Sequence, residues 1–436
     1  MGILADDKEY IWHPFTQMKL ADPPVHIVKA EGCYLYDANG KRYLDGISSW
    51  WVNIHGHAHP HIAESLTRQA LEIDHIMFAG FTHSPAVLLA EKLLNILPNH
   101  FSKVFYSDNG STAVEVALKM GLQFWKNKEE HGKNKIIAFE DAYHGDTFGA
   151  MSVGERSAFN AAFKDFLFDV ERLPLPTDDN IEECIQQFTF LAKSKRIAAF
   201  IFEPLVLGAG GMRMYKAEYL DRLLSIAKEH DIICIADEVM TGFGRTGKNF
   251  ACEYLSNKPD IICLSKGITG GILPLAVTIC TDKIFDAFYS DEATKALFHG
   301  HSYTANPIAC AAALASMELL IYDHSQNQIQ LITASHSLFL QRIKDDPFIK
   351  EVRCTGTILA IEILTTEGTS YFHQIKGDAY KFFMDNGVLL RPLGNVIYFM
   401  PPYCITKQEL EQVYKVISDG LLFLKKKYYQ DAGINK

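Results

Sequence analysis

The stretch Asp260-Ile-Ile-Cys-Leu-Ser-Lys266-Gly-Ile-Thr-Gly-Gly271 joins a short apolar run to a lysine and then to glycines. The apolar run predicts a buried strand, and the glycines predict a tight connection after it. A lysine at the end of a buried strand lies near low-dielectric surroundings, where its amine loses a proton more easily and can attack a carbonyl. Lys266 is therefore the first candidate catalytic residue.

A second apolar run, Ile232-Ile-Cys-Ile-Ala-Asp237, ends in an acid. A lysine that forms a Schiff base and an aspartate that faces a pyridinium nitrogen are the pair that pyridoxal phosphate (PLP) requires. A solvated loop lysine and a helix-capping aspartate would give the same pattern. The remaining motifs must decide between these two interpretations.

Strand and helix signals alternate through the middle of the chain. Strands are predicted at 103–106, 136–139, 197–202, 232–236, 261–264 and 275–280, and helices at 112–125 and 216–229, the first opened by a capping box at Thr112-Ala-Val-Glu115. This alternation predicts an α/β fold with a mostly parallel sheet sandwiched by helices. Ligands of such sheets bind at the carboxyl ends of the strands, where Asn109-Gly-Ser111, Asp237 and Lys266 all fall.

The two ends of the chain have a different pattern. Residues 20–46 contain hairpin-like pieces with a turn at Asp37-Ala-Asn-Gly40, and residues beyond about 320 mix helices with short strands. We expect residues 47–318 to form a large cofactor-binding domain. Residues 1–46 and 319–436 are expected to build a smaller α+β domain together.

Composition excludes several classes of protein. The chain has 436 residues and a net charge of −10 with no long basic stripe, so nucleic-acid binding is not expected. No apolar stretch reaches membrane-spanning length, and the N-terminus does not resemble a signal peptide. The nine dispersed cysteines form no C-x-x-C pair, which predicts a reducing, cytoplasmic setting.

Other motifs leave alternatives open. Ser107-Asp-Asn-Gly-Ser-Thr112 is typical of a phosphate-binding helix start, or of an ordinary capped loop. The segment Gly242-Phe-Gly-Arg-Thr-Gly-Lys248 nearly matches a P-loop, but Asn249 replaces the magnesium-binding hydroxyl. A nucleotide-binding module is therefore one alternative. The preferred interpretation is a glycine-rich loop that orders Arg245. The run His55-Gly-His-Ala-His-Pro-His61 predicts no metal site, because glycine and proline interrupt a regular strand.

Three further side chains are candidates for a pocket. In extended chain, the indoles of Trp50 and Trp51 would point opposite ways, one into the core and the other into a pocket wall. Tyr143 follows a strand and could stack on a flat cofactor ring. Arg391 is a lone cation in an apolar strand, so it is either a clamp for a substrate carboxylate or a surface arginine.

These motifs together resemble the class III aminotransferases of the fold-type I PLP enzymes over nearly the whole chain. The matching segments are Ile11-Trp-His-Pro-Phe-Thr-Gln-Met18, Gly46-Ile-Ser-Ser-Trp-Trp51, Ala142-Tyr-His-Gly-Asp-Thr-Phe-Gly149, Gly208-Ala-Gly-Gly-Met-Arg213, Ala236-Asp-Glu-Val239 with Thr241-Gly-Phe-Gly-Arg-Thr-Gly-Lys248, Arg391-Pro-Leu-Gly394 and Tyr398-Phe-Met-Pro-Pro402. The Asp-Glu and Lys266 motifs are shared by the whole class. The double Trp, the 143–149 run and the late Arg-Pro and Met-Pro-Pro segments are narrower, and they resemble the branch that acts in biotin biosynthesis.

The resemblance implies a role for each motif. Lys266 would bind PLP and move the proton, Asp237 would keep the pyridine nitrogen protonated, and Tyr143 would stack on the ring as the third catalytic residue. The remaining cofactor-binding residues would be Gly110, Ser111, His301 and Ser302, with Gly300, His301 and Ser302 reaching across the interface of a homodimer. The substrate-binding residues would be Phe15, Trp50, Tyr143, Gly300, Arg391 and Tyr398, and no metal is expected.

The resemblance also implies the substrates. The acceptor would be 8-amino-7-oxononanoate, with S-adenosylmethionine as the expected amine donor and lysine as the alternative. Phe15 stands where many members have a tyrosine, and His301-Ser302 replaces a common Pro-Thr pair; both departures favour lysine. Another class III reaction, on ornithine, acetylornithine or 4-aminobutyrate, is a further alternative.

Overall fold

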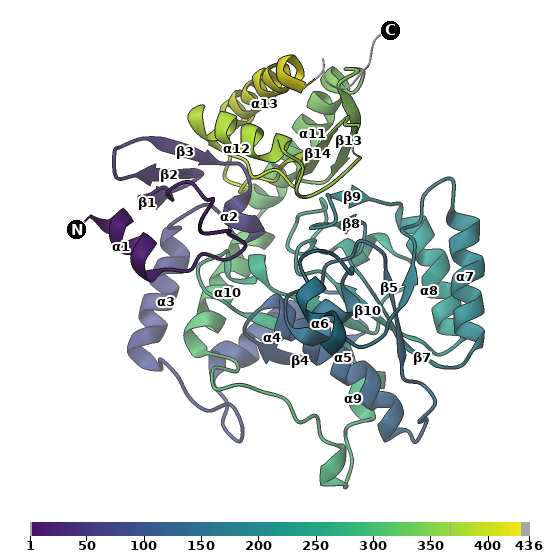
Figure 1. Ribbon diagram of the computed structural model, residues 1–436. Helices are drawn as coiled ribbons and strands as arrows, with labels where there is room; N and C mark the ends of the chain where they lie inside the picture. The colour runs from purple at the N-terminus through teal and green to yellow at the C-terminus, as the bar shows by residue number, and fades with distance from the viewer. Residues whose placement is uncertain (1, 367, 429–436) are drawn as a thin grey trace.

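A large sheet forms the centre of the computed structural model, which describes residues 2–366 and 368–428 (Figure 1). Its strands are β4 (Phe101–Ser107), β5 (Lys135–Phe139), β6 (Glu171–Leu173), β7 (Ile197–Phe202), β10 (Ile233–Asp237), β11 (Ile261–Leu264) and β12 (Ala276–Thr281), in the spatial order β4-β12-β11-β10-β7-β5-β6. Strand β12 pairs antiparallel with both of its neighbours, and the other pairs are parallel. The predicted mostly parallel α/β sheet is therefore confirmed.

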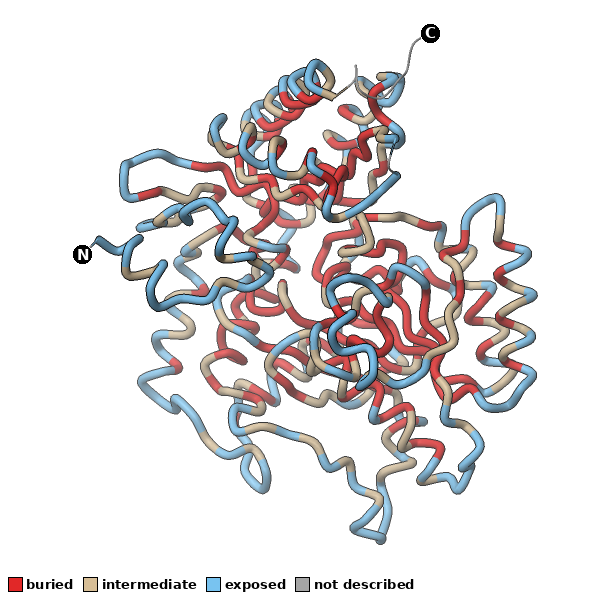
Figure 2. Tube along the Cα trace, in the orientation of Figure 1, coloured by how far each residue is buried: buried red, intermediate tan, exposed pale blue. Residues whose placement is uncertain are grey.

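Helices cover both faces of this sheet because its strands are apolar on both sides. Ile233 and Ile235 of β10 pack with α5 (Gly110–Asn127), α6 (Phe148–Val153) and α9 (Asp282–Asp286). Cys234 and Ala236, one residue out of phase, pack with α4 (Ser84–Ile96), α7 (Ile181–Lys193) and α8 (Ala217–Glu229). The buried trace in Figure 2 follows these strands through the centre of the large domain.

Helix α5 begins earlier than the sequence predicts. It starts at Gly110, where the Asn109 side chain accepts the Thr112 N–H at 3.1 Å and the Thr112 hydroxyl accepts the Asn109 N–H at 3.2 Å. The predicted Thr112–Glu115 capping box is therefore wrong. The Glu115 carboxylate instead accepts the Gly149 N–H at 2.7 Å, because it lies one turn inside the helix and faces α6.

The two ends of the chain meet in one sheet. Strands β1 (Ile27–Glu31), β2 (Tyr34–Asp37) and β3 (Arg42–Asp45) form an antiparallel meander, and β15 (Val388–Leu389) adds to it parallel to β3. A neighbouring sheet contains β13 (Ile349–Thr355), β14 (Ile358–Ile363) and β16 (Val396–Phe399). This pairing supports our proposal that residues 1–46 and 319–436 form one small domain.

The remaining α-helices and strands connect and cover these sheets. They are α1 (Ile3–Tyr10), α2 (Ser48–Trp51), α3 (Pro60–Glu72), α10 (Pro307–Ile321), α11 (Asp323–Ile343), α12 (Ile375–Asp385), α13 (Lys407–Tyr428), β8 (Val206–Leu207) and β9 (Arg213–Met214). Within the described ranges, no helix combines the length and the hydropathy needed to cross a bilayer.

Candidate active site

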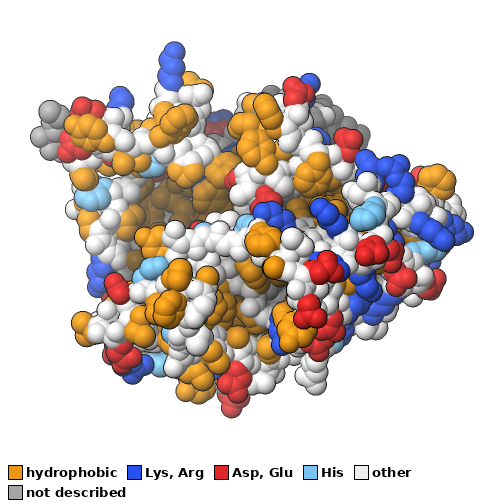
Figure 3. Space-filling view, turned by 90° about the horizontal axis from the view of Figure 1, so that it is seen from below, with side chains coloured by type: hydrophobic (Ala, Val, Ile, Leu, Met, Phe, Trp, Pro, Cys, Tyr) orange, Lys and Arg blue, Asp and Glu red, His pale blue; other side chains and the backbone are white. Residues whose placement is uncertain are grey.

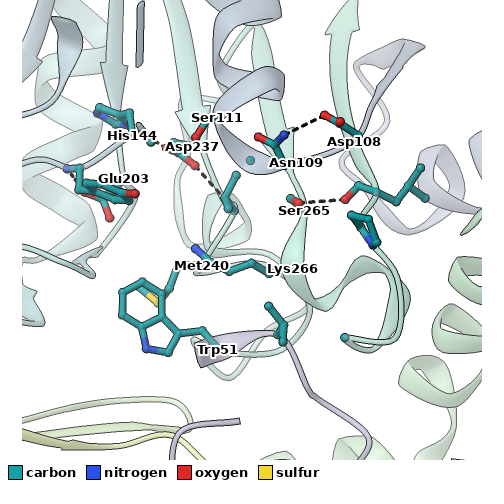
Figure 4. Close-up of a pocket in the computed structure, with 18 of the residues that line it drawn as sticks. Trp51, Asp108, Asn109, Ser111, His144, Glu203, Asp237, Met240, Ser265 and Lys266 are labelled. Carbon is teal, nitrogen blue, oxygen red and sulfur yellow. Dashed lines mark hydrogen bonds and ion pairs between the residues drawn. The ribbon is translucent and has the colours of Figure 1, made fainter. Parts of the chain in front are cut away.

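A cavity of about 420 Å³ opens at the carboxyl ends of the parallel strands, the edge where such sheets bind ligands. Its wall includes predicted site residues from four separate segments: Gly110 and Ser111, Tyr143, Asp237, and Lys266. Figure 4 shows the Lys266 side chain between Asp237 on one side and Trp51 on the other. Residues far apart in sequence thus converge on a single amine.

The amine of Lys266 is buried inside this cavity. Burial lowers the pKa of Lys266 below its ordinary value of 10.5, although the nearby Asp237 and Glu203 carboxylates oppose that shift. The backbone at Lys266 has a φ of 49°, a strained conformation for a residue with a side chain. A buried amine with a lowered pKa is a better nucleophile at neutral pH than an exposed lysine.

Asp237 is held by a histidine that the sequence analysis did not assign to the site. His144 Nδ1 lies 2.7 Å from Asp237 Oδ2, and both side chains are buried. The Val239 N–H donates to the other carboxylate oxygen at 3.1 Å. These contacts fix the orientation of the carboxylate, as second-layer partners do in other buried sites. His144 directly follows Tyr143, but its sequence position gave no sign that it would face Asp237.

Glu203 is a second buried carboxylate that the sequence analysis missed. It follows β7 just as Asp237 ends β10, so the rule that ligands lie at the carboxyl ends of strands could have found it. Its two oxygens accept the N–H groups of Tyr143 and Gly208, each at 2.9 Å. Burial raises the pKa of Glu203 to about 7, with Asp237 adding to the effect and His144 opposing it.

The start of α5 forms a cradle for an anion. The first intrahelical bond is made by the Ala113 N–H to the Asn109 carbonyl, so the N–H groups of Gly110 and Ser111 precede the hydrogen-bonded ladder. A Cβ at position 110 would come within 2.6 Å of the Val239 side chain, so only glycine fits there. The predicted phosphate site is therefore at the cavity wall.

The two tryptophans come from a left-handed turn, not from extended chain. Residues Ser48, Ser49, Trp50 and Trp51 have φ values of 50°, 44°, 70° and 77°. For residues other than glycine, this conformation costs roughly 1–2 kcal/mol each. The extended chain predicted for this pair is therefore wrong, because tertiary contacts hold the segment in a left-handed turn. Trp51, which was not among the predicted substrate-binding residues, is buried and lines the cavity, whereas Trp50 is partly exposed.

An aromatic cluster with one arginine surrounds Trp50. The Arg391 guanidinium lies 4.5 Å from the centre of the Trp50 ring, and Phe15 contacts the same ring edge-on at 5.6 Å. Tyr398 is buried below, and its hydroxyl accepts the Trp51 Nε1–H at 3.0 Å. Phe15, Trp50, Arg391 and Tyr398 thus surround the tryptophan turn rather than the Lys266 amine.

The predicted residues Gly300, His301 and Ser302 do not line the cavity of the described chain. Gly300 and Ser302 are exposed, and His301 is half-buried. The histidines of the His55–His61 run face different partners: His55 Nε2 contacts Ser316, His57 Nε2 donates to Asp45, and His61 contacts Glu318. Across residues 2–366 and 368–428, no cluster of His, Cys, Asp and Glu has the arrangement of a metal site.

The glycine-rich loop orders Arg245, as the sequence predicts. Gly244 and Gly247 both have a φ of 97°, which side chains rarely adopt. Arg245 is buried and donates to the Pro401 carbonyl at 2.9 Å and to the Trp51 carbonyl at 3.3 Å. The loop therefore supports the tryptophan turn instead of presenting its N–H groups to a nucleotide.

The residues present fit PLP. A buried amine of lowered pKa suits the aldehyde, an oriented carboxylate suits the pyridine nitrogen, and a helix start with a glycine cradle suits the phosphate. Tyr143 lies in the same wall, with its backbone fixed by Glu203. These groups occupy one cavity, as a single cofactor requires.

Comparison with known proteins agrees with this geometry. The model of the family "Aminotransferase class-III" matches residues 16–421. The adenosylmethionine-8-amino-7-oxononanoate aminotransferase of Synechococcus elongatus is 48% identical, over 94% of this chain and 98% of that protein.

Solved structures are similar too. The crystal structure of the enzyme of the same name from Methanocaldococcus jannaschii has a TM-score of 0.91 at 38% identity, covering 95% of this chain and 97% of that one. A PLP-bound amine transaminase from an uncultivated Pseudomonas species has a TM-score of 0.88 at 30% identity, covering 95% and 98%. The chain therefore belongs to the class III aminotransferase family, and it is a PLP-dependent aminotransferase of fold type I.

Proposed function

We propose that this aminotransferase converts 8-amino-7-oxononanoate to 7,8-diaminononanoate in biotin biosynthesis, with S-adenosylmethionine as the amine donor. The observation that carries the proposal is the placement of Arg391 on Trp50, next to the residue that faces Lys266. A half-buried guanidinium at this position suits the carboxylate of an acceptor whose ketone reaches the amine. The full-length relatives named for this reaction support the same assignment.

When bound, PLP supplies an aldehyde that carries the amino group between substrates and a pyridine ring that accepts electrons. Lys266 Nζ would hold the cofactor and then move the proton between the substrate carbon and the cofactor. Asp237, oriented by His144, would keep the proton on the pyridine nitrogen. Gly110 and Ser111 would hold the phosphate at the start of α5.

The substrate would lie between the tryptophan turn and the ring-stacking Tyr143. Trp50 and Phe15 would form its apolar wall, and Arg391 would bind its carboxylate. Tyr398 would support the wall through its hydrogen bond to Trp51. Burial raises the pKa of the Tyr398 hydroxyl, which keeps it a neutral hydrogen-bonding partner across the physiological range.

We further propose that the enzyme is a cytoplasmic homodimer with shared sites. The segment that carries Gly300, His301 and Ser302 is largely exposed, and Phe298 and Tyr303 beside it are 76% and 65% exposed. Figure 3 shows hydrophobic side chains gathered around a hollow on the lower face of the molecule. A second copy packed over the Gly300–Ser302 segment would bury Phe298 and Tyr303 and bring His301 and Ser302 to the partner's phosphate site.

The test is a half-reaction. Enzyme loaded with PLP is mixed with S-adenosylmethionine alone or lysine alone, and the loss of the visible cofactor band is followed. We expect S-adenosylmethionine to bleach the band and 8-amino-7-oxononanoate to restore it. Bleaching by lysine alone would assign lysine as the donor, the alternative that Phe15 favours because it lacks the hydroxyl of the more common tyrosine. Turnover of ornithine, acetylornithine or 4-aminobutyrate, with no response to 8-amino-7-oxononanoate, would refute the acceptor.

A further inference from the structure

The tryptophan turn, residues 48–51, contains no glycine although each of its residues has a positive φ. It closes as a left-handed helical turn, in which the Trp51 N–H donates to the Ile47 carbonyl at 2.8 Å and the Val52 N–H donates to the Ser48 carbonyl at 3.0 Å. Such a turn persists only where surrounding contacts over-determine it, and strain of this kind concentrates at functional sites. The contacts that hold it are therefore candidates for a functional role.

One set of contacts comes from the C-terminal part of the chain and from the glycine-rich loop. The Ser48 hydroxyl donates to the Met400 carbonyl at 2.8 Å, and the Trp51 indole donates to Tyr398 at 3.0 Å. Arg245 donates to the Trp51 carbonyl at 3.3 Å. These bonds connect both ends of the turn to Met400, Tyr398 and Arg245.

The other set converges on Asp45, the last residue of β3. Its side chain is completely buried, and its Oδ2 accepts the Ser49 hydroxyl at 2.8 Å and His57 Nε2 at 2.9 Å. Its Oδ1 accepts the Ile47 N–H at 3.2 Å. Asn53 Nδ2 donates to His57 Nδ1 at 3.1 Å, so the ring carries its proton on the nitrogen that faces Asp45. One carboxylate thus contacts the residue before the turn, the middle of the turn and His57 in the segment that follows it.

The tryptophan turn contacts two parts of the site, Lys266 and Arg391. The Trp51 ring lies 4.8 Å from Lys266 Nζ, and the ring of Trp50 lies 4.5 Å from the Arg391 guanidinium. Because these indoles are consecutive in one hydrogen-bonded turn, the turn lies between the reacting amine and the guanidinium and contacts both. A change in the turn would alter the space between the two groups without touching either of them.

We propose that Asp45, acting with Ser49 and His57, is a positioning residue that holds the tryptophan turn and thereby sets the spacing between Lys266 and Arg391 that a carboxylate-bearing acceptor must match. This inference rests on the proposed function in taking Arg391 as the carboxylate-binding group. It assigns no chemical step to Asp45, which acts only through Trp50 and Trp51.

The test compares Asp45→Asn and Ser49→Ala with the wild-type holoenzyme. Asn keeps the size of the side chain but can accept with only one oxygen, and Ala removes one hydrogen bond to the turn. We expect KM for 8-amino-7-oxononanoate to rise about tenfold in each variant, with a smaller change in kcat. The near-ultraviolet circular dichroism of the indoles should change, and the visible band of the bound cofactor should not.

Two further variants separate positioning from general stability. Ser49→Gly also loses the hydroxyl, but glycine adopts a positive φ without strain, so its KM should lie closer to wild type than that of Ser49→Ala. Asp37→Asn is the matched control, since Asp37 is a buried carboxylate of β2 that accepts the Asn39 and Lys41 N–H groups. It should lower the melting temperature and leave KM and the indole signal unchanged.

The inference is overturned if Asp45→Asn and Ser49→Ala behave as Asp37→Asn does, with lower stability but wild-type KM and indole spectra. Failure of the proposed function is a separate outcome: wild-type enzyme would then not turn over 8-amino-7-oxononanoate. The indole spectra, and crystal structures of Ser49→Ala and Ser49→Gly, would still report whether Asp45 and Ser49 hold the turn.

Discussion

The edge of the large sheet and the tryptophan turn meet in one cavity but are built in opposite ways. Asp237 ends one parallel strand, and Glu203 and Lys266 follow its two neighbours, so the regular pairing of the sheet brings them together. The turn is strained and depends on partners far along the chain, such as Met400, 352 residues from Ser48. The reacting groups therefore come from regular structure, whereas the turn beside them takes its shape from long-range contacts.

The largest expected effect is at the sheet edge. Lys266→Ala removes the only group proposed both to hold the cofactor and to move the proton, so turnover should fall by at least about 10⁴-fold. Borohydride reduction followed by intact-mass measurement should find no trapped cofactor in this variant. A trapped adduct on another residue would contradict the assignment of Lys266, because the chemistry would then lie outside the sheet edge.

Asp237→Asn should have the next largest effect. A neutral amide cannot hold the pyridine proton, so kcat should fall by about 10²- to 10⁴-fold while the cofactor stays bound. Steady-state kinetics together with the visible spectrum measure both quantities. Near-normal turnover would show that the contact between His144 and Asp237 is only structural.

Arg391→Ala probes the other side of the comparison, the pocket built around the turn. Loss of a desolvated ion pair should raise KM for the oxononanoate by about 30- to 900-fold, equivalent to about 2–4 kcal/mol. Because Arg391 lies against Trp50 and not against Lys266, kcat should change much less. An unchanged KM would show that Arg391 does not bind the substrate carboxylate.

The smallest effect concerns stability at the sheet edge. The pKa of Glu203 is raised to about 7 from its ordinary 4.5, so the native state holds this proton more tightly than the unfolded chain. That contribution is complete below pH 4.5 and is lost as the pH rises through 7, a total of about 3 kcal/mol. In cofactor-free enzyme, the free energy of unfolding of wild type should fall by this amount relative to Glu203→Gln between pH 4.5 and 8, measured by denaturant titration.

Glu362→Gln is the control for that measurement. Its hydrogen bonds and ion pairs with Lys350, Thr369 and Arg353 outweigh burial and hold the pKa of Glu362 at about 2, so it does not titrate in this window. The difference between wild type and Glu362→Gln should therefore change by only about 0.4 kcal/mol from pH 4.5 to 8, as the unfolded carboxyl finishes its titration. If Glu203→Gln behaves in the same way, the Glu203 carboxyl is ionised throughout and the sheet edge carries an additional negative charge.

The strands, and the cavity residues that follow them, were predictable from the sequence. Apolar runs at 197–202, 232–236 and 261–264 fall within one residue of β7, β10 and β11. Asp237 and Lys266 were found because a charged residue after a buried run stands out. Glu203 obeys the same rule and was overlooked, whereas His144 gave no periodic signal because its partner is 93 residues away.

The sequence by itself therefore determined the layered fold and the reacting groups, because strand burial and strand ends depend on short-range patterns of apolar and charged residues. Only the tertiary structure decided the conformation of Ser48–Trp51, since these residues disfavour a left-handed turn and adopt it under constraint from Asp45, Arg245 and the Met400 carbonyl. It also decided that Trp51 faces Lys266 and Trp50 faces Arg391. The bonds of Ser48 to Met400 and of Arg245 to Trp51 span 352 and 194 residues, and short-range patterns cannot report such contacts.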